Sequence, residues 1–480
     1  MDMFDILVVG GGINGCAIAR DAAGRGQKVL LVEKDDLAGH TSSASSKLAH
    51  GGLRYLEQYE LRLVRESLAE RELLLRNAPH IARPLRFILP DAPGLRPRWM
   101  IRVGLWLYDL FAFRGSLPRA RNVGRTDAAR APLAAPNRPL LSYWDGRVDD
   151  SRLTVLNAVD AAERGAEIAT RTEFLSAARE DGAWRAQLSG GRTVFAQAIV
   201  NAAGPWVCEV LEQRIDVESR SRVRLVKGSH IIVPALHDGD QAYILQQPDG
   251  RVVFVLPFEG LSLIGTTDMP VTAPADETAS AEEIDYLCAA ANLYFAKPIA
   301  PGDVIWSYAG IRALHDDGAS AAQDVTRDYA LELDEEDGAA LLSVFGGKIT
   351  TARALASEAL ERLEIPGFKF TRTTPLPGGD IFPDFIAWLD ETGHWMPAEM
   401  LNRLSRAYGT RMRTIVGEAR SLAALGRDLG HGLTEAEVRY LVETEFARTV
   451  DDILWRRSKL GLRFTAGQVT ALADFLGTLV

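Results

Sequence analysis

Apolar runs and small residues alternate regularly at the N-terminus of the chain. Ile6 to Val9 and Val29 to Val32 are short apolar runs that are typical of buried strands. Between them, residues 10–15 read GGGING, and the alanine-rich residues 16–23 have the composition of a helix. Glu33 directly follows the second run. This order of strand, glycine turn, helix, strand and acid predicts a Rossmann-like unit that binds a dinucleotide.

Five residues of this unit are candidate cofactor contacts. Gly10 permits the tight turn, Gly12 lets the backbone approach a pyrophosphate at the helix N-terminus, and Gly15 allows the helix to pack closely on the strand. Asn14 lies in the same turn, and Glu33 is placed to accept hydrogen bonds from ribose hydroxyls. A loop that binds no nucleotide is the alternative, but it would not require the acid after the second strand.

The later segments change pattern several times. Residues 170–195 form short alternating stretches broken by Asp-Gly and Gly-Gly, which predicts a small β-meander. Leu225 to Asp268 is again rich in β-type runs that are separated by turns. Leu341 to Val344 is a predicted strand that opens into residues 345–351, FGGKITT, and a helix follows. Beyond residue 379 the pattern indicates several helices.

Two glycine turns, at residues 10–15 and 346–347, each join a strand to a helix, and this indicates one nucleotide fold interrupted by a second domain. For residues 346–347 an ordinary tight turn is the alternative. An interrupted fold favours FAD over free nicotinamide, because the helix after Lys348 would point its positive end at a ring that gathers negative charge on reduction. We predict an α/β protein with a Rossmann-like FAD-binding domain, an antiparallel β substrate domain that interrupts it, and a C-terminal α-helical domain. The expected boundaries are 1–80, 145–215 and 335–365 for the FAD-binding domain, 81–144 and 216–334 for the substrate domain, and 380–480 for the helical domain.

Composition and charge exclude several classes of function. Hydrophobic residues make up 47% of the 480 residues and charged residues 25%, as in packed soluble proteins. The net charge of −10 disfavours nucleic acid as a partner, so an anionic substrate would need a local cluster of Arg and Lys. Cys16, Cys208 and Cys288 lie far apart, and we expect no bound metal, no disulfide and a cytoplasmic location. No apolar run reaches the roughly 18 residues of a transmembrane helix.

Several motifs resemble those of FAD-dependent glycerol-3-phosphate dehydrogenases. The longest is TSSASSKLAHGGLRYL at residues 41–56. The resemblance implies oxidation of sn-glycerol 3-phosphate to dihydroxyacetone phosphate by hydride transfer to FAD, with electrons passed to membrane quinone, and a homodimeric assembly. Further segments that occur in the family's order are VDD at 148–150, NAAGPW at 201–206, KGSH at 227–230, GTTD at 265–268, TRDY at 326–329 and FGGK at 345–348.

A phosphomonoester dianion needs several fixed donors. Arg54, Arg312, Arg327 and Lys348 are the candidates, because guanidinium groups bind phosphate oxygens in a bidentate way. Each of them alone is more typical of a surface charge or an ion-pair partner. Arg54, Arg312 and Lys348 rank first as catalytic-site residues because of the motifs that contain them, whereas Arg327 has a ready ion-pair partner in Asp328 beside it.

Loss of hydride from a secondary alcohol is easier when its hydroxyl proton is removed, so a neutral base is expected near the substrate C2 oxygen. His50 is the first candidate, since the ordinary pKa of about 6.5 suits this role. The alternative is that His50 only hydrogen-bonds backbone or cofactor. His230 is the reserve base. Tyr55 is a candidate donor to the substrate, or else an aromatic packing residue.

The remaining predicted cofactor contacts come from three segments: residues 41–46, residues 203–206 and the second glycine turn at 346–350. The hydroxyl-rich residues 41–47 could satisfy phosphate oxygens, with a flexible linker as the alternative. Small residues around 203 would let the backbone pass close to a ligand. These contacts are Thr41, Ser42, Ser45, Ser46, Ala203, Gly204, Trp206, Gly346, Gly347 and Thr350.

Residues 96–114 interleave aromatic and aliphatic residues with basic ones, including Trp99, Trp106, Arg98 and Arg102. This pattern predicts a helix in the lipid headgroup region on the inner face of the cell membrane, as a quinone acceptor would require. The alternative is a helix packed inside the substrate domain or at a dimer contact. The rival functions are an oxidase that passes the same electrons to oxygen and a catalytically idle flavin-binding protein.

Overall fold

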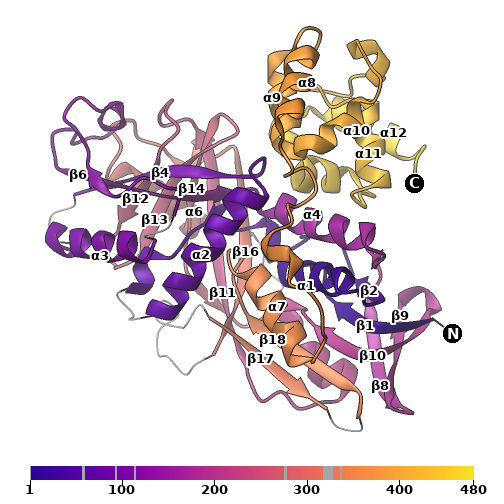
Figure 1. The fold of residues 1–480 in the computed structure, drawn as a ribbon. Helices are drawn as coiled ribbons and strands as arrows, with labels where there is room; N and C mark the ends of the chain where they lie inside the picture. The colour runs from indigo at the N-terminus through magenta and orange to yellow at the C-terminus, as the bar shows by residue number, and fades with distance from the viewer. Residues whose placement is uncertain are drawn as a thin grey trace.

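The computed structural model describes residues 2–56, 60–91, 95–112, 115–274, 278–316, 328–335 and 338–480, apart from the side chains of Arg54 and Tyr55. Two sheets and a group of C-terminal helices make up the chain (Figure 1). The predicted α/β class with a helical C-terminal part is confirmed.

The first sheet has the strand order β17-β18-β10-β1-β2-β7, and β18, β10, β1, β2 and β7 are parallel. The predicted β-meander forms the hairpin β8–β9, which pairs with β10. Helices α1, α4 and α7 lie on one face. The bounds are β1 (Met3–Val9), α1 (Ile13–Gly24), β2 (Val29–Val32), α4 (Asp150–Glu163), β7 (Glu167–Ala169), β8 (Phe174–Glu180), β9 (Ala183–Leu188), β10 (Thr193–Asn201), α5 (Val207–Glu209), β17 (Tyr329–Asp334), β18 (Ala340–Gly346) and α7 (Ala352–Arg362).

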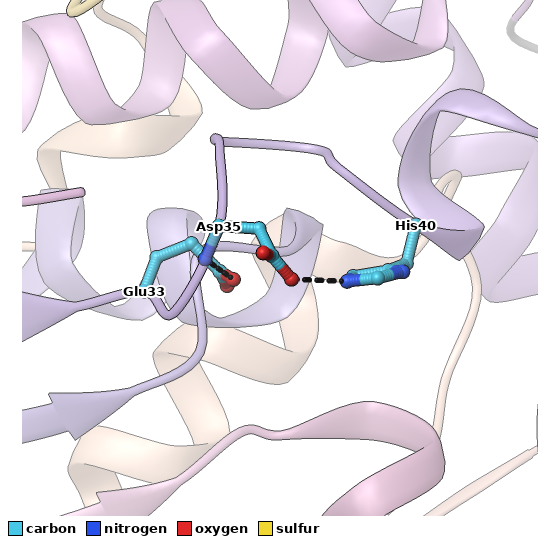
Figure 2. A group of neighbouring side chains, drawn as sticks. All are labelled: Glu33, Asp35 and His40. Carbon is cyan, nitrogen blue, oxygen red and sulfur yellow. Dashed lines mark hydrogen bonds and ion pairs between the residues drawn. The ribbon is translucent and has the colours of Figure 1, made fainter. Parts of the chain in front are cut away.

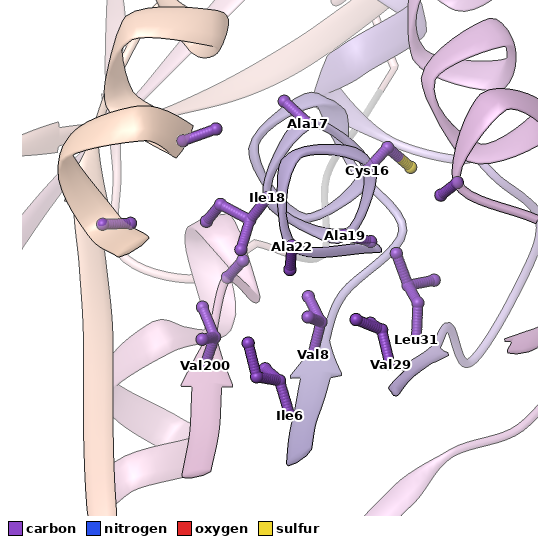
Figure 3. Packing of buried hydrophobic residues seen from close by; sticks show 14 of the residues in the cluster. Ile6, Val8, Cys16, Ala17, Ile18, Ala19, Ala22, Val29, Leu31 and Val200 are labelled. Carbon is purple, nitrogen blue, oxygen red and sulfur yellow. The ribbon is translucent and has the colours of Figure 1, made fainter. Parts of the chain in front are cut away.

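Helix α1 packs on this sheet through small and branched apolar side chains. Ile18 and Ala22 of the helix face Ile6 and Val8 of β1, and all four are fully buried (Figure 3). Alanines dominate the helix, so its backbone approaches the strands closely. The Rossmann-like unit predicted from the glycine turn is confirmed.

The second sheet has the order β15-β11-β14-β13-β12-β4-β6-β3, with β16 on β11 and β5 on β6. Its pairs are antiparallel except β12–β4, which is parallel. These two strands come from separate excursions of the chain, so no hairpin turn requires them to run in opposite directions. Helix α6 covers one face, and α2 and α3 cover the other. The bounds are β3 (Leu48–Ala49), α2 (Leu61–Asn77), β4 (Ala82–Pro90), α3 (Arg98–Phe111), β5 (Arg121–Asn122), β6 (Leu140–Val148), β11 (Val223–Pro234), β12 (Ala242–Gln246), β13 (Val252–Phe258), β14 (Leu261–Gly265), β15 (Met269–Val271), α6 (Ala281–Asn292) and β16 (Trp306–His315).

The chain passes between the two sheets at more places than the expected domain boundaries predict. Strand β3 and helix α2 fall within the predicted 1–80 portion of the FAD-binding domain, yet they pack with the second sheet. Strand β6 continues to Val148, past the expected boundary at 145. The chain therefore passes between the sheets within the TSSASSKL segment, which brings that segment to their junction.

The C-terminal helices have a core of their own and are tied to the first domain by buried ion pairs. The bidentate pair Arg152–Glu445 includes one bond of 2.8 Å, and Arg457 donates to both oxygens of Asp36 at 2.6 and 2.8 Å. Because Asp36 lies three residues after Glu33, this domain supports the loop next to the predicted ribose contact. The helices are α8 (Pro383–Gly393), α9 (Ala398–Tyr408), α10 (Met412–Val416), α11 (Glu435–Glu443) and α12 (Ala466–Leu476).

Candidate active site

A cavity of about 970 Å³ lies at the junction of the two sheets. Most of the residues predicted to bind cofactor or substrate line it, although they come from segments more than 300 residues apart. The predicted residues that line it are Gly10, Gly12, Asn14, Glu33, Thr41, Ser42, Ser45, Ser46, His50, Ala203, Gly204, Trp206, Arg312, Gly346, Gly347, Lys348 and Thr350.

The two glycine turns meet at one edge of the first sheet. β1 and β18 lie on either side of β10 and run parallel to it, so the carboxyl ends of all three strands lie at the same edge of the sheet. Asn14 Nδ2 of the first turn donates to the carbonyl oxygen of Gly346 in the second at 3.2 Å. The carboxyl edge of a parallel sheet is where α/β folds bind nucleotides. Residues 346–347 therefore belong to the same α/β sheet as the first glycine turn. An unrelated tight turn would not be expected to contact it.

Gly10 shows why the first turn requires glycine. Its φ is +110°, and a Cβ at this position would lie 2.6 Å from the carbonyl oxygen of Ala202. Any side chain would therefore push the turn away from β10. The turn leads into the N-terminus of α1, where the amides of the first turn face the cavity and suit a pyrophosphate. In the structure Ser42 Oγ accepts from one of them, the N–H of Ile13, at 3.0 Å.

Glu33 occupies the end of β2, as expected for a ribose contact. Its Oε2 accepts the Gly11 N–H at 2.7 Å and its Oε1 accepts the Asp35 N–H at 2.9 Å. Asp35 in turn pairs with His40 Nε2 at 2.9 Å (Figure 2). Burial raises the pKa of Glu33, and the two backbone amides oppose this shift. These bonds fix the carboxylate at the cavity wall, next to the glycine turn.

Trp206 forms the far wall of this end of the cavity. The His40 ring lies against it with centroids 4.7 Å apart, and Lys34 Nζ is 3.9 Å from the ring centroid. Neither of these neighbours was predicted from the sequence. Lys34 directly follows Glu33, so its position after the second strand was the available signal.

The hydroxyl-rich loop at 41–47 is ordered by bonds within the protein. Thr41 Oγ1 donates to the carbonyl oxygen of Ile311 at 2.6 Å, and Ser45 Oγ donates to Asp150 Oδ2 at 2.7 Å. Ser46 Oγ lies 2.8 Å from His230 Nε2. These hydroxyls have internal partners in the structure, so the interpretation as a flexible linker is wrong for this loop.

Asp150 is the residue that holds this loop, and sequence reasoning gave it no role. It is fully buried, and Lys47 Nζ donates to both of its oxygens at 2.8 Å. Lys47 has a left-handed backbone with φ of +59°. The VDD motif at 148–150 was the signal, since a buried aspartate at a helix start commonly orders a neighbouring loop.

His50 lines the cavity beside Lys348. Burial, and secondly the positive charge of Lys348, lower the pKa of His50 to about 4. The imidazole is therefore neutral at physiological pH and able to accept a proton, as a general base must be.

Arg312 of β16 reaches the cavity in an ion pair. Its Nη1 donates to Asp268 and its Nη2 donates to Thr266 Oγ1 at 2.9 Å. Asp268 and Thr266 lie in the GTTD motif and also line the cavity. They orient the planar guanidinium group, and a fixed orientation is required for it to donate to two phosphate oxygens at once.

Two other predicted residues, His230 and Gly15, do not line the cavity. His230 is 1% exposed, stacks on Tyr308 with centroids 4.8 Å apart, and contacts the cavity-lining Ser46 without lining the cavity itself, so its role as reserve base stays a prediction. Gly15 packs against the Gly10 carbonyl and serves helix packing alone. The side chains of Arg54 and Tyr55, and the whole of Arg327, lie outside the described residues.

A Rossmann-like sheet, two glycine turns at its carboxyl edge and a cavity with a neutral histidine define a dinucleotide-binding oxidoreductase. The FAD dependent oxidoreductase family matches residues 5–357, and the C-terminal domain of alpha-glycerophosphate oxidase matches residues 369–476. The chain therefore belongs to the FAD dependent oxidoreductase family, and the glycine cradle fits its FAD cofactor. The resemblance found in the sequence is confirmed.

Known proteins resemble this chain over its full length. A D-erythritol 1-phosphate dehydrogenase of Brucella abortus is 49% identical over 98% of this chain and 97% of its own. A glycerol-3-phosphate dehydrogenase of Pseudomonas aeruginosa is 48% identical over 99% and 95%, and the aerobic enzyme of Escherichia coli is 45% identical over 99% and 98%. The glycerol-3-phosphate dehydrogenase of Bacillus halodurans complexed with FAD superimposes with a TM-score of 0.71 at 26% identity, over 99% and 94%.

Proposed function

We propose that this protein oxidises sn-glycerol 3-phosphate to dihydroxyacetone phosphate and passes the electrons through FAD to a membrane quinone. The observation that carries the proposal is that one cavity brings the dinucleotide cradle, the neutral His50 and the cationic Arg312 and Lys348 together. Relatives at 45–48% identity over the whole chain are glycerol-3-phosphate dehydrogenases.

The residues of the cavity have different roles in the proposed reaction. Bound FAD supplies the acceptor for the hydride that leaves substrate C2. His50 takes the C2 hydroxyl proton at its neutral imidazole nitrogen as the C–H bond breaks. Arg312 and Lys348 bind the phosphate, and by resemblance Arg54 joins them. Burial, and secondly the positive charge of Lys348, lower the pKa of His50 and so keep its imidazole unprotonated.

A longer polyol phosphate is the second candidate substrate, because the relative with 49% identity is a D-erythritol 1-phosphate dehydrogenase. Both substrates have a phosphate at one end and a secondary alcohol beside it, so the same residues would act on either one.

Anaerobic reduction of the bound flavin tests the proposed function. We expect glycerol 3-phosphate to bleach the yellow flavin band of the purified protein, and glycerol without phosphate to leave it unchanged, because the cationic residues have nothing to bind. Faster bleaching by D-erythritol 1-phosphate would identify the second candidate. Intact flavin that no polyol phosphate bleaches would identify the idle protein, and stoichiometric peroxide in air without quinone would identify the oxidase.

An apolar lobe of the cavity supports quinone as the acceptor. Side chains of α3 and of strands β4, β12 and β13 of the second sheet line this part of the cavity. A quinone ring is apolar, so this lobe gives it a route from the membrane toward the flavin. The lobe is lined by Leu53, Leu56, Phe87, Leu89, Met100, Ile101, Val103, Leu107, Ile244 and Phe254.

Helix α3 presents an apolar face to solvent. Trp99 is 68% exposed, Trp106 63% and Val103 50%, whereas Tyr108 on the inner side is buried. Arg98 and Arg102 lie on the same helix. Exposed tryptophans flanked by arginines are typical of helices that lie in the lipid headgroup region. Among the described residues, no helix is long and apolar enough to cross a membrane. We propose that α3 binds the inner face of the cell membrane from one side.

Removing the two exposed tryptophans tests this surface. We expect Trp99→Ser with Trp106→Ser to weaken binding to phosphatidylglycerol vesicles by about tenfold per tryptophan, because each indole leaves the lipid. Vesicle co-sedimentation measures the effect. The matched control is Phe368→Ser with Phe382→Ser, since these aromatics are 76% and 60% exposed elsewhere on the chain. Equal binding by both double variants would contradict a role for α3.

A further inference from the structure

The inner side of α3 is hydrogen-bonded to the loop that carries His50. The backbone N–H of Gly51 donates to Tyr108 Oη at 2.9 Å, and Tyr108 Oη donates to Asp145 Oδ2 at 2.5 Å. Tyr108 and Asp145 are 1% and 0% exposed. A single buried hydroxyl therefore connects the residue next to His50 with α3 and β6.

The direction of these bonds follows from the Gly51 amide, which can only donate, so the Tyr108 oxygen accepts from it and the hydroxyl hydrogen points to Asp145. Burial, and secondly the negative charge of Asp145, raise the pKa of Tyr108 well above its ordinary value. The tyrosine hydroxyl therefore stays protonated and donates a hydrogen bond to Asp145. Its oxygen lone pair accepts the hydrogen bond from the Gly51 amide. Asp145 is itself held by Arg71 of α2, whose Nη1 donates to Oδ1 at 3.1 Å.

The contact requires glycine at position 51. A Cβ there would lie 2.6 Å from Tyr108 Oη and 2.5 Å from Leu68 Cδ2. The next residue, Gly52, has φ of +75°. At Gly51 the close neighbour is therefore the tyrosine behind the loop.

We propose that Tyr108 is a positioning residue for His50, holding the loop at 50–52 against the cavity wall through the Gly51 amide. This inference rests on the proposed function, because it assigns His50 the role of base. An unpaired buried amide is costly, so loss of the hydroxyl would loosen the loop and admit water to the imidazole.

Tyr108→Phe in the flavin-loaded full-length protein tests the proposal. The matched control is Tyr408→Phe, because Tyr408 Oη likewise donates to a buried carboxylate, Glu437, at 2.7 Å, but in the C-terminal domain. Hydrogen–deuterium exchange reports on the amide without any need for catalysis. We expect the Gly51 amide to exchange at least tenfold faster in Tyr108→Phe and at the unaltered rate in Tyr408→Phe.

Anaerobic stopped-flow reduction by glycerol 3-phosphate reports on His50. We expect Tyr108→Phe to reduce its flavin about tenfold more slowly at saturating substrate, with the KM little changed. The acid limb of its pH profile should move upward from about pH 4, because a hydrated imidazole regains an ordinary pKa. If Tyr108 only stabilised the fold, the pH of the acid limb would be the same in Tyr108→Phe as in the wild type.

Gly51→Ala supplies a second variant, since its methyl group would separate the same two partners from the other side. Unchanged exchange at residue 51 together with an unmoved acid limb, in both variants, would overturn the proposal. If no polyol phosphate reduces the wild-type flavin, the proposed function fails, while the exchange measurement still decides whether Tyr108 holds the loop.

Discussion

Replacing His50 by asparagine is expected to lower the rate constant for flavin reduction by about 10²–10⁴-fold, the usual contribution of a general base. Asparagine preserves hydrogen bonding but does not accept the hydroxyl proton. The FAD content should stay the same, because the glycine cradle and Glu33 are untouched. Stopped-flow bleaching under anaerobic conditions measures the rate, and the flavin absorbance of the purified variant measures the content.

The pH dependence of the wild-type rate gives an independent check on His50. The base must be neutral, so the rate should be constant at neutral pH and fall only as the pH drops through about 4, the lowered pKa of His50. In His50→Asn this limb should vanish. The matched control is His394→Asn, because His394 is exposed in the C-terminal domain. An equal loss in both variants, or an acid limb that persists in His50→Asn, would remove His50 from the role of base.

Replacing Arg312 by alanine is expected to raise the KM for glycerol 3-phosphate by about 10- to 100-fold, since charge-assisted hydrogen bonds are worth roughly 1.5–3 kcal/mol. The substitution also leaves the Asp268 carboxylate facing the phosphate without its partner. This repulsion adds to the loss of the donor. Steady-state kinetics with a quinone analogue measures the KM, and the FAD content should be unaffected.

Two variants separate substrate binding from general loss of an ion pair. Arg86→Ala breaks the pair between Arg86 of β4, on the same sheet as Arg312, and Asp127; both residues lie outside the cavity lining, and the KM should equal that of the wild type. Arg312→Ala with Asp268→Asn removes the exposed carboxylate and should recover part of the KM. A wild-type KM in Arg312→Ala would exclude Arg312 from phosphate binding.

The Rossmann-like unit could be predicted because its signals are local. The turn at Gly10 needs a positive φ, the helix after it needs small residues, and Glu33 must follow the second strand. All of these requirements lie within about one strand–helix–strand unit, where spacing along the chain translates directly into geometry.

The parallel β12–β4 pair and the placement of β3 in the second sheet were missed for the opposite reason. Their partners come from distant parts of the chain, and an apolar run of strand length has the same pattern whichever neighbour it pairs with. The expected domain boundaries therefore differ from the observed sheets at β3 and at the end of β6.

The sequence by itself determined the dinucleotide cradle, the family and most of the residues that line the site. These features depend on short-range backbone requirements and on motif spacing, and both can be read from neighbouring residues. The tertiary structure decided which charges and hydroxyls have partners. It buried His230 against Tyr308, paired Arg312 with Asp268, set Tyr108 behind Gly51 and left the tryptophans of α3 exposed. Burial and pairing depend on contacts between segments far apart in the chain, and these exist only after the two sheets have packed together.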